Sequence, residues 1–359
     1  MQKAIPYMQL RGGSSKGLFF LSKDLPEDVE AIKRSVLLAM EGTTEGDPRQ
    51  IDGLGGAHSL TSKAAVVGPS KHPDADVDYL FLQVVVGKGQ VSTGQTCGNI
   101  LAGVAPFSIE TGLVKASDPV TRVRVNMLNT GGICEVLVET PGRQVNYEGT
   151  ARIDGVPGTA APIICNYLDV AGSTCGALLP TGKVLDEVDG YELTCIDNGM
   201  PVVLLRAADF GLSGYESVED LSSNLELKAQ IEQIRLKVGP LMNLGNVAQK
   251  TVPKMCLIAP PKDGGVLHTR MFIPHVLHDA IGVLAAISVA TAVVVPGSIA
   301  EGISQLPSQN VKLFSIEHPS GECTVQLNYE LLDGKIGVKK AGVLRTARLL
   351  SRGELFVEV

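Results

Sequence analysis

The chain has 359 residues, of which 44% are hydrophobic, 19% charged and 4% aromatic, with no tryptophan. This length favours two domains, and the composition is typical of a well-packed protein with an aliphatic core. The net charge of −7 provides no general attraction for nucleic acid or for an anionic membrane, so we expect neither as a partner. An anionic ligand must therefore be held by local groups.

The cysteines indicate a reducing compartment. Seven are present and no two form a C-x-x-C pair, which argues against a disulfide framework and against a structural zinc site. The first residues, Met-Gln-Lys-Ala-Ile-Pro, contain no apolar signal core, so we expect a cytoplasmic protein. The uncharged segment 281–295 is too short to cross a bilayer and ends at a Pro-Gly pair, which favours a buried helix.

The N-terminal residues predict two strands, at 5–10 and 18–21, joined by a glycine-rich turn at 11–17. The turn lacks the G-x-x-x-x-G-K-S/T spacing and leads into a strand, so we exclude a nucleotide phosphate loop. Its backbone N–H groups, two hydroxyls and two cations suit a carboxylate instead, although a solvated basic hairpin has the same composition. The side chains concerned are Arg11, Ser14, Ser15 and Lys16.

A lysine follows in a distinctive position. We expect a helix that begins at Pro26 and stops at Gly42, a glycine-rich segment at 51–58, and an apolar strand at 60–67. Lys63 lies at the head of that strand, where partial burial would make it competent as a base. The alternative is an ordinary surface lysine.

A cysteine follows in a second distinctive position. The strong strand at 79–86 leads to a polar turn at 92–95, then to Cys97, then to an apolar run at 100–105 that is suited to a buried helix. A thiol at a helix start meets unpaired N–H groups and the positive end of the helix dipole, which favour the thiolate. Cys97 is therefore the best candidate for a reactive group, and the alternative is a small buried hydrophobic residue.

The remaining elements repeat this order. A period-two pattern predicts a hairpin from 123–127 and 134–139, and a domain change is expected at 182/183 within a Pro-Gly-containing stretch. Each half then offers strands, a hairpin and one apolar helix reached through a polar turn, which suggests a duplicated α+β architecture. The second half is expected to contain strands in 191–205, a helix from Asn224 to Leu241, strands at 254–259 and 267–273, the uncharged helix after Asp279, and strands at 311–317, 323–329 and 344–349.

Several chemistries are compatible with parts of this pattern. His275 and His278 are three residues apart, but Asp279, the acid beside them, is better explained as the cap of the following helix, so we expect no metal. No G-x-S-x-G motif supports a serine hydrolase, whereas a Cys–His hydrolase stays open. Cys97 paired with a lysine suits proton transfer at carbon, in which one group removes a proton and the other returns it elsewhere.

Several ordered motifs together resemble the PrpF family, over nearly the whole chain. The family includes 2-methylaconitate cis-trans isomerase and 4-oxalomesaconate tautomerase or isomerase. The chain's shorter length and its Gly-Ala-His version of the segment before Lys63 look more like the oxalomesaconate enzymes. The motifs are Arg-Gly-Gly-Ser-Ser-Lys-Gly (11–17), Ile-Asp-Gly-Leu-Gly-Gly (51–56) running to Leu-Thr-Ser-Lys (60–63), Cys-Gly-Asn (97–99), Ile-Asp-Gly-Val-Pro-Gly-Thr-Ala (153–160) and Glu-His-Pro-Ser-Gly (317–321).

The resemblance implies a diaminopimelate-epimerase-like α+β fold: two similar domains, each a curled, mainly antiparallel sheet around a central helix. It places Lys63 and Cys97 in an N-terminal domain, 1–182, and the active site in the cleft towards a C-terminal domain, 183–359. Epimerases of this fold use one cysteine from each domain. Because the helix start in the second half (274–280) has no cysteine, the family pairing of Lys63 with Cys97 fits better.

The resemblance also implies a cofactor-independent isomerase that acts on a small anionic di- or tricarboxylate, most simply 4-oxalomesaconate. The alternatives are 2-methylaconitate cis-trans isomerase and a non-catalytic carboxylate-binding protein. A homodimer is compatible with the sequence, which leaves the oligomeric state open. Proton removal creates an enolate that needs nearby N–H donors. The substrate-binding candidates are Arg11, Ser14, Ser15, Lys16, Gly98, Asn99, His275, His318, Ser320 and Gly321.

Overall fold

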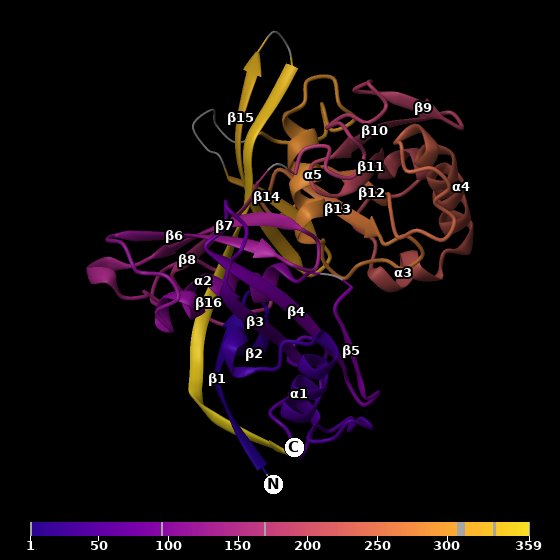
Figure 1. Ribbon diagram of the computed structural model, residues 1–359. Coiled ribbons are helices and arrows are strands. Elements are labelled where there is room, and N and C mark those ends of the chain that lie inside the picture. Colours follow the sequence, from indigo (N-terminus) through magenta and orange to yellow (C-terminus); the bar gives the residue numbers. More distant parts are fainter. Residues whose placement is uncertain (1, 95, 169, 307–312, 333–334, 359) are drawn as a thin grey trace. The chain divides into compact units, whose positions relative to one another are not determined.

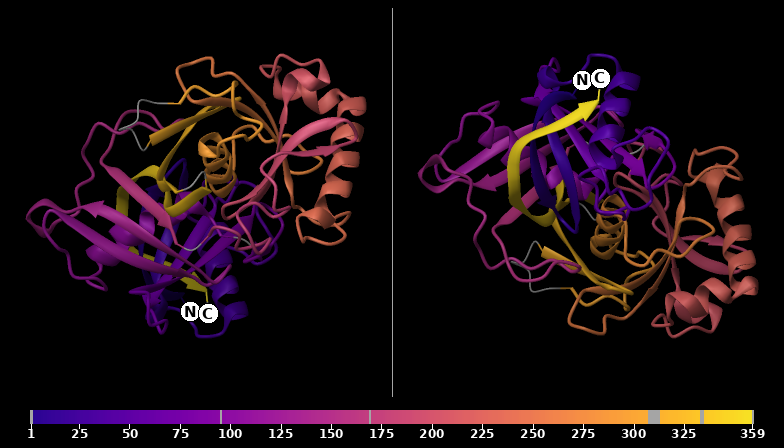
Figure 2. Two further views of the ribbon diagram at one scale, coloured as in Figure 1. Left: turned by 90° about the horizontal axis from the view of Figure 1, so that it is seen from above. Right: turned by 90° about the horizontal axis from the view of Figure 1, so that it is seen from below.

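The computed structural model describes residues 2–358 except 95, 169, 307–312 and 333–334 (Figure 1). The chain divides into two compact units. Unit 1 comprises Met1–Asn166 together with Leu344–Val359, and unit 2 comprises Tyr167–Val343. Unit 1 is therefore built from both ends of the chain, and Figures 1 and 2 show the two termini side by side, with Gln2 paired to Glu358.

The strands of unit 1 follow the order β1-β2-β3-β4-β6-β7-β8, and their pairings alternate between antiparallel and parallel up to β7. β5 pairs with β4, and the C-terminal part of β16 pairs with β1. The strands are β1 (Gln2–Gly12), β2 (Ser15–Leu21), β3 (Lys63–Pro69), β4 (Val77–Val85), β5 (Gln90–Ser92), β6 (Val120–Met127), β7 (Gly132–Glu139), β8 (Pro162–Tyr167) and β16 (Lys335–Glu358).

Two α-helices cover the two faces of this sheet. In α1 (Val29–Glu41) the Asp28 side chain caps the first turn by accepting from the backbone N–H of Ala31, and Gly42 ends the helix with φ 72°. α1 buries its apolar stripe against one face, in a cluster that contains alternate residues of β3 and β4. α2 (Gly98–Glu110) contacts β1, β2, β3, β4, β6 and β7 and is buried from Ile100 to Ser108. Two short 3-10 helices are η1 (Ser22–Asp24) and η2 (Pro141–Arg143).

Unit 2 repeats this design. Its pairings again alternate between antiparallel and parallel, in the order β15-β14-β13-β12-β11-β10, and β9 pairs with β10. The strands are β9 (Asp186–Val188), β10 (Tyr191–Asp197), β11 (Pro201–Arg206), β12 (Lys254–Ala259), β13 (Leu267–Phe272), β14 (Leu313–His318) and β15 (Gly321–Leu332), which also pairs with β16.

The helices of unit 2 occupy matching places. α5 (Val283–Val294) contacts β10, β11, β14 and β15, whereas α4 (Leu225–Leu241) packs on the opposite face, as Figure 2 shows. Asn224 caps α4 by accepting from the backbone N–H of Leu227, as predicted. The remaining helices are η3 (Ala207–Phe210) and α3 (Val218–Ser223). The prediction of an α+β fold with a central helix in each half is confirmed.

Several local predictions were wrong. The helix expected from Pro26 begins only at Val29, after its cap Asp28. The turn between β1 and β2 is only Gly13-Ser14, because Arg11 pairs with Lys16 and Gly12 with Ser15, and Gly13 takes the positive φ (53°) that a tight hairpin requires. Asp279 does not cap the uncharged helix, because α5 begins after Gly282. An isolated bridge between Phe272 and Leu277 holds residues 273–278 in a separate turn ahead of the helix.

The predicted boundary at 182/183 differs from the observed division at 166/167. Residues 172–175 belong to unit 2 because they are hydrogen-bonded to the end of β10. The Gly172 N–H donates to the Asp197 backbone oxygen at 2.7 Å, and the Thr174 and Cys175 N–H groups donate to the Asp197 carboxylate. The predicted strand at 311–317 begins outside the described residues, as does position 95 of the predicted 92–95 turn. None of the described helices is both long and apolar enough to span a membrane.

Candidate active site

Lys63 is the first residue of β3 and its side chain is buried, with 7% of the residue exposed. Ala64 and Val66 pack towards α1, so Lys63 and Ala65 point to the face that carries α2. The Nζ atom donates to Oε1 of Gln83, which lies opposite Lys63 on β4, and stands 5.4 Å from the centre of the Phe81 ring. Burial thus holds the lysine in an apolar setting with an uncharged partner.

Lys63 and Cys97 lie close enough to interact electrostatically. Burial lowers the pKa of the Lys63 ammonium, and the nearby Cys97 thiolate acts in the opposite direction. A lysine without a carboxylate partner is more readily deprotonated than one held in an ion pair, so this arrangement suits a base.

Cys97 is the residue before α2 and has extended backbone angles (φ −127°, ψ 108°). Its side chain makes no capping hydrogen bond, and its backbone oxygen accepts from the Leu101 N–H at 2.9 Å and from the Tyr79 hydroxyl at 3.3 Å. All seven cysteines are free, and Cys97 alone among them is partly exposed. The other six cysteines are buried, so each of them is the small buried hydrophobic residue that was the alternative for Cys97.

The β1–β2 hairpin packs directly on the start of α2. The Asn99 side-chain amide donates to the Ser14 hydroxyl at 3.1 Å and to the Ser15 hydroxyl at 3.5 Å. A Cβ atom on Gly12 would lie 2.2 Å from the Asn99 backbone oxygen, and one on Gly13 would lie 2.1 Å from Asn99 Oδ1. Only glycine allows this approach, which brings the hairpin hydroxyls beside the free N–H groups of the first helical turn.

The two cations of the hairpin differ in their surroundings. Arg11 Nη1 donates to the Gly13 backbone oxygen, and to both the backbone oxygen and the hydroxyl of Thr346, at 2.9 to 3.1 Å. Burial and the neighbouring Arg348 lower the pKa of Arg11. This guanidinium therefore ties the hairpin to β16. The Lys16 N–H donates to the Leu60 backbone oxygen, which fixes the hairpin to the segment before Lys63.

A buried amide organises the glycine-rich segment ahead of Lys63. Gln50 Oε1 accepts from the Ala57 N–H and from the Ser62 hydroxyl, both at 2.7 Å, and Gln50 Nε2 donates to Glu41 at 3.3 Å. Gln50, Ser62 and Glu41 are at most 3% exposed. A Cβ atom on Gly55 would lie 2.0 Å from Gln50 Oε1, which explains the glycine there. This network fixes the residue immediately before the lysine.

The candidate histidines of unit 2 differ in burial. His318 is buried at the end of β14, and its Nδ1 lies 3.3 Å from the Ser320 hydroxyl in the turn before Gly321. His275 is different: its side chain is 60% exposed, and its Nδ1 is 3.7 Å from a carboxylate oxygen of Glu232 on α4. Among the described residues, no three His, Cys, Asp or Glu side chains are grouped as in a metal site.

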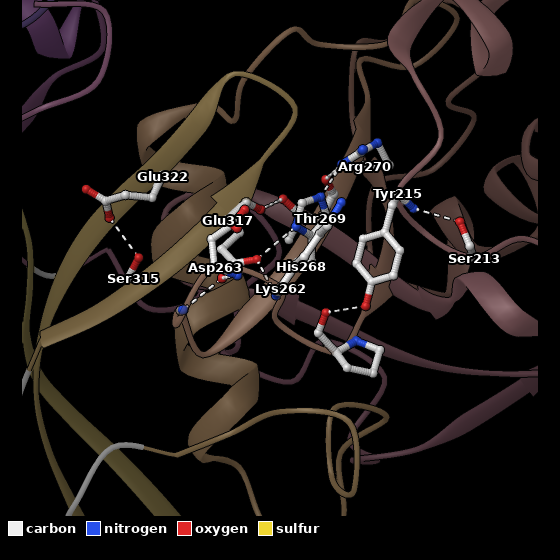
Figure 3. Close-up of polar contacts among 12 residues, drawn as sticks. Ser213, Tyr215, Lys262, Asp263, His268, Thr269, Arg270, Ser315, Glu317 and Glu322 are labelled. Atoms are coloured by element: carbon white, nitrogen blue, oxygen red, sulfur yellow. Dashed lines mark hydrogen bonds and ion pairs between the residues drawn. The ribbon is translucent and has the colours of Figure 1, made fainter.

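Glu317, the neighbour of His318 in the sequence, is the centre of a polar network that the sequence did not reveal (Figure 3). The Glu317 carboxylate accepts from the backbone N–H groups of Lys262, Asp263 and Gly265 at 2.7 to 2.8 Å and from His268 Nδ1 at 2.9 Å. Burial alone would raise the pKa of Glu317, but these donors together lower it. Arg270 contacts His268 Nε2, and since arginine only donates, His268 carries its proton on Nδ1.

Gln83 is the site residue that sequence reasoning missed. The sequence predicts an apolar strand at 79–86, and the one signal for Gln83 is its amide in the period-two register of Tyr79 and Phe81, on the face towards α2. Unit 2 has a matching lysine, Lys254, as the first residue of β12, and burial lowers its pKa as well. At the corresponding helix start stands Gly282 in place of a thiol.

The chain is similar to known proteins over nearly its full length. The family model described as "PrpF protein" matches residues 2–358. A (4E)-oxalomesaconate Delta-isomerase from Novosphingobium sp. (strain KA1) is 55% identical over 352 residues, covering 98% of this chain and 97% of the relative. A 4-oxalomesaconate tautomerase from Pseudomonas putida (strain KT2440) is 53% identical, covering 98% and 96%. The crystal structure of a methylitaconate-delta-isomerase superposes with a TM-score of 0.88 at 34% identity, covering 99% and 96%.

Proposed function

Because this chain belongs to the PrpF family, we propose that this isomerase moves a proton within 4-oxalomesaconate, or a closely related unsaturated oxo-tricarboxylate, with Lys63 and Cys97 as its acid-base pair. The observation that carries the proposal is the buried Lys63 amine, held by an uncharged amide beside the Cys97 thiol. The names of the two curated relatives support the choice of substrate.

The proposed reaction balances without any other reactant. The neutral Lys63 amine removes a proton from a carbon next to the carbonyl and alkene groups, and the electron pair spreads into a dienolate. The Cys97 thiol then gives its proton to a different position of that dienolate. This leaves an ammonium and a thiolate, and transfer of one proton between them restores the pair. In the reverse direction the thiolate acts as base and the ammonium as acid.

The surroundings of the pair supply what this chemistry needs. The free N–H groups of Gly98 and Asn99 at the start of α2 can stabilise negative charge on the dienolate. The Ser14 and Ser15 hydroxyls, held there by Asn99, and the Lys16 cation suit a carboxylate of the substrate. In unit 2, His318, Ser320 and Gly321 stay predicted substrate contacts.

The test is exchange of substrate C–H with deuterium oxide, followed by NMR together with product formation. Wild type should exchange and isomerise 4-oxalomesaconate, whereas Lys63→Met and Cys97→Ser should each lose at least 100-fold in rate, the scale of general acid-base catalysis. Lys115→Met, which removes an exposed lysine of the same unit, is the matched control and should retain the wild-type rate. Dialysis against EDTA should leave the rate unchanged.

Two outcomes would overturn the proposal. Full activity of both variants would remove the acid-base pair, and thermal stabilisation by the substrate without any exchange in wild type would indicate a carboxylate-binding protein. Turnover of 2-methylaconitate in preference to 4-oxalomesaconate would assign the other substrate.

A further inference from the structure

Gln83 lies between Lys63 and the backbone around it. It stands on β4 directly opposite Lys63, and its Oε1 accepts from Lys63 Nζ. Its Nε2 donates to three backbone oxygens, those of Ser59 at 3.1 Å, Ser62 at 3.2 Å and Val84 at 3.1 Å. The side chain thus connects the lysine to the loop before it and to its own strand.

These contacts fix which way the amide points. Rotating it by 180° would place Oε1 against three carbonyl oxygens and Nε2 against the lysine, so the three hydrogen bonds to the backbone and the one from the ammonium would be lost. Lys63 therefore faces a hydrogen-bond acceptor both when it is an ammonium and when it is a neutral amine. An amide with fewer backbone partners could turn to donate to the neutral amine and so occupy its lone pair.

The fixed acceptor has two consequences for a neutral Lys63. The amine donates one N–H to Oε1, so its lone pair is directed away from Gln83. The acceptor carries no charge, so it stabilises the ammonium far less than a carboxylate would. Among the described groups next to Lys63, β2 places Gly17 beside it and β4 places Phe81 and Gln83 there. Cys97, the residue before α2, is a titratable group that interacts with it.

We propose that Gln83 is a positioning residue that orients the lone pair of the neutral Lys63 amine and, by being uncharged, keeps that amine available as a base. The inference rests on the proposed acid-base function of Lys63. It also predicts how substitutions of Gln83 change the pKa of Lys63, which can be measured without any substrate.

The direct measurement is the pKa of Lys63, from the pH dependence of the side-chain NMR signal that disappears in Lys63→Met. Gln83→Glu keeps the shape of the side chain and adds a charge, so it should raise the pKa of Lys63 by about 1–2 pH units. Gln83→Met removes the acceptor and keeps the site apolar, so it should lower that pKa. Gln144→Glu adds the same charge at an exposed position of unit 1 and should leave it unchanged.

The activity profile gives the second readout. In Gln83→Glu the bell-shaped dependence of kcat/KM on pH should move to higher pH, with about a tenfold loss on its acidic side for each pH unit of displacement. In Gln83→Met, kcat should fall at least tenfold while KM changes little, because the lone pair is no longer oriented.

Opposite signs in the two variants distinguish positioning from simple packing. If Gln83 only excluded water, Gln83→Met, which keeps the site apolar, would leave the pKa of Lys63 unchanged, and that result would overturn the inference. An unchanged pKa in Gln83→Glu would overturn it as well. Failure of the wild type to isomerise any tested substrate would instead refute the proposed function, while the measured pKa values would still test the role of Gln83.

Discussion

Replacing Glu317 by Gln tests how the buried carboxylate of unit 2 holds its surroundings. Each carboxylate oxygen serves two donors: Oε2 accepts from Lys262 N–H and His268 Nδ1, and Oε1 accepts from the Asp263 and Gly265 N–H groups. A glutamine has one carbonyl oxygen and one NH2 group. Whichever way it turns, two of these donors then face another donor, and one of the two, His268 or Gly265, is buried.

The magnitude follows from those two lost bonds. Glu317 is 3% exposed, so water cannot take the place of the missing acceptor. Leaving a buried donor unpaired costs about 1–3 kcal/mol, and the two lost bonds therefore cost about 2–6 kcal/mol in the free energy of unfolding. For a unit of this size, a loss of about 4 kcal/mol corresponds to a Tm lower by roughly 8–16 °C.

The assay combines calorimetry with hydrogen exchange of individual amides. In Glu317→Gln the N–H groups of Lys262, Asp263 and Gly265 should exchange at least tenfold faster, while the α1 amides of unit 1 should keep their rates. Glu322→Gln is the matched control on the same β14–β15 hairpin (Figure 3). Its carboxylate accepts from the hydroxyls of Ser315 and Thr324, which can reorient, so the loss should be about 1 kcal/mol or less.

The reasoning would be refuted if Glu317→Gln lost less than about 1 kcal/mol with unchanged exchange in residues 262–265. Such a result would mean that the loop holds its conformation without the carboxylate. An equal loss in Glu317→Gln and Glu322→Gln would also contradict it, because burial would then make no difference.

Two further predictions concern the hairpin of unit 1 and the histidine of unit 2. Gly13→Ala should raise KM at least tenfold with little change in kcat, because the added Cβ would displace Asn99 from Ser14. The control is Gly112→Ala, which has a similar positive φ (76°) but open space around it and should keep the wild-type KM. Equal effects of the two substitutions on KM would contradict the argument. Burial lowers the pKa of His268 in the folded protein. Its contribution to the free energy of unfolding is therefore complete above the ordinary pKa of 6.5 and is lost as the pH falls through the lower folded pKa. A two-dimensional 1H–15N spectrum should show the Nδ1–H tautomer at pH 7, and an Nε2–H tautomer would exclude the Arg270 contact.

The sequence predicted those parts of the fold that depend on local pattern. β12, Lys254–Ala259, was expected at the residues where it is found, because an apolar run between a Pro-Lys and a Pro-Pro leaves little choice. Cys97 was expected at a helix start because a polar turn precedes an uninterrupted apolar run, and it is the residue before α2. The PrpF resemblance proved correct across the chain.

What the sequence could not supply depends on contacts between distant segments. Asp279 satisfies every local rule for a cap, but the bridge between Phe272 and Leu277 uses the chain around it and moves the helix start to Gly282. Gln83 looks like an unremarkable polar residue in an apolar strand until β3 is laid beside β4. The Glu317 network likewise joins residues about 50 positions apart.

The return of the C-terminus to β1 has a consequence for synthesis on the ribosome. Unit 2 is one continuous stretch, so all of it has been translated before residues 344–359 are added. Throughout that time β1 lacks its outer neighbour, and its unpaired edge is open to other nascent chains. The unit that carries Lys63 and Cys97 is therefore completed only after unit 2 has been synthesised, and a chain that stops before residue 344 carries both residues without the strand segment that pairs with β1.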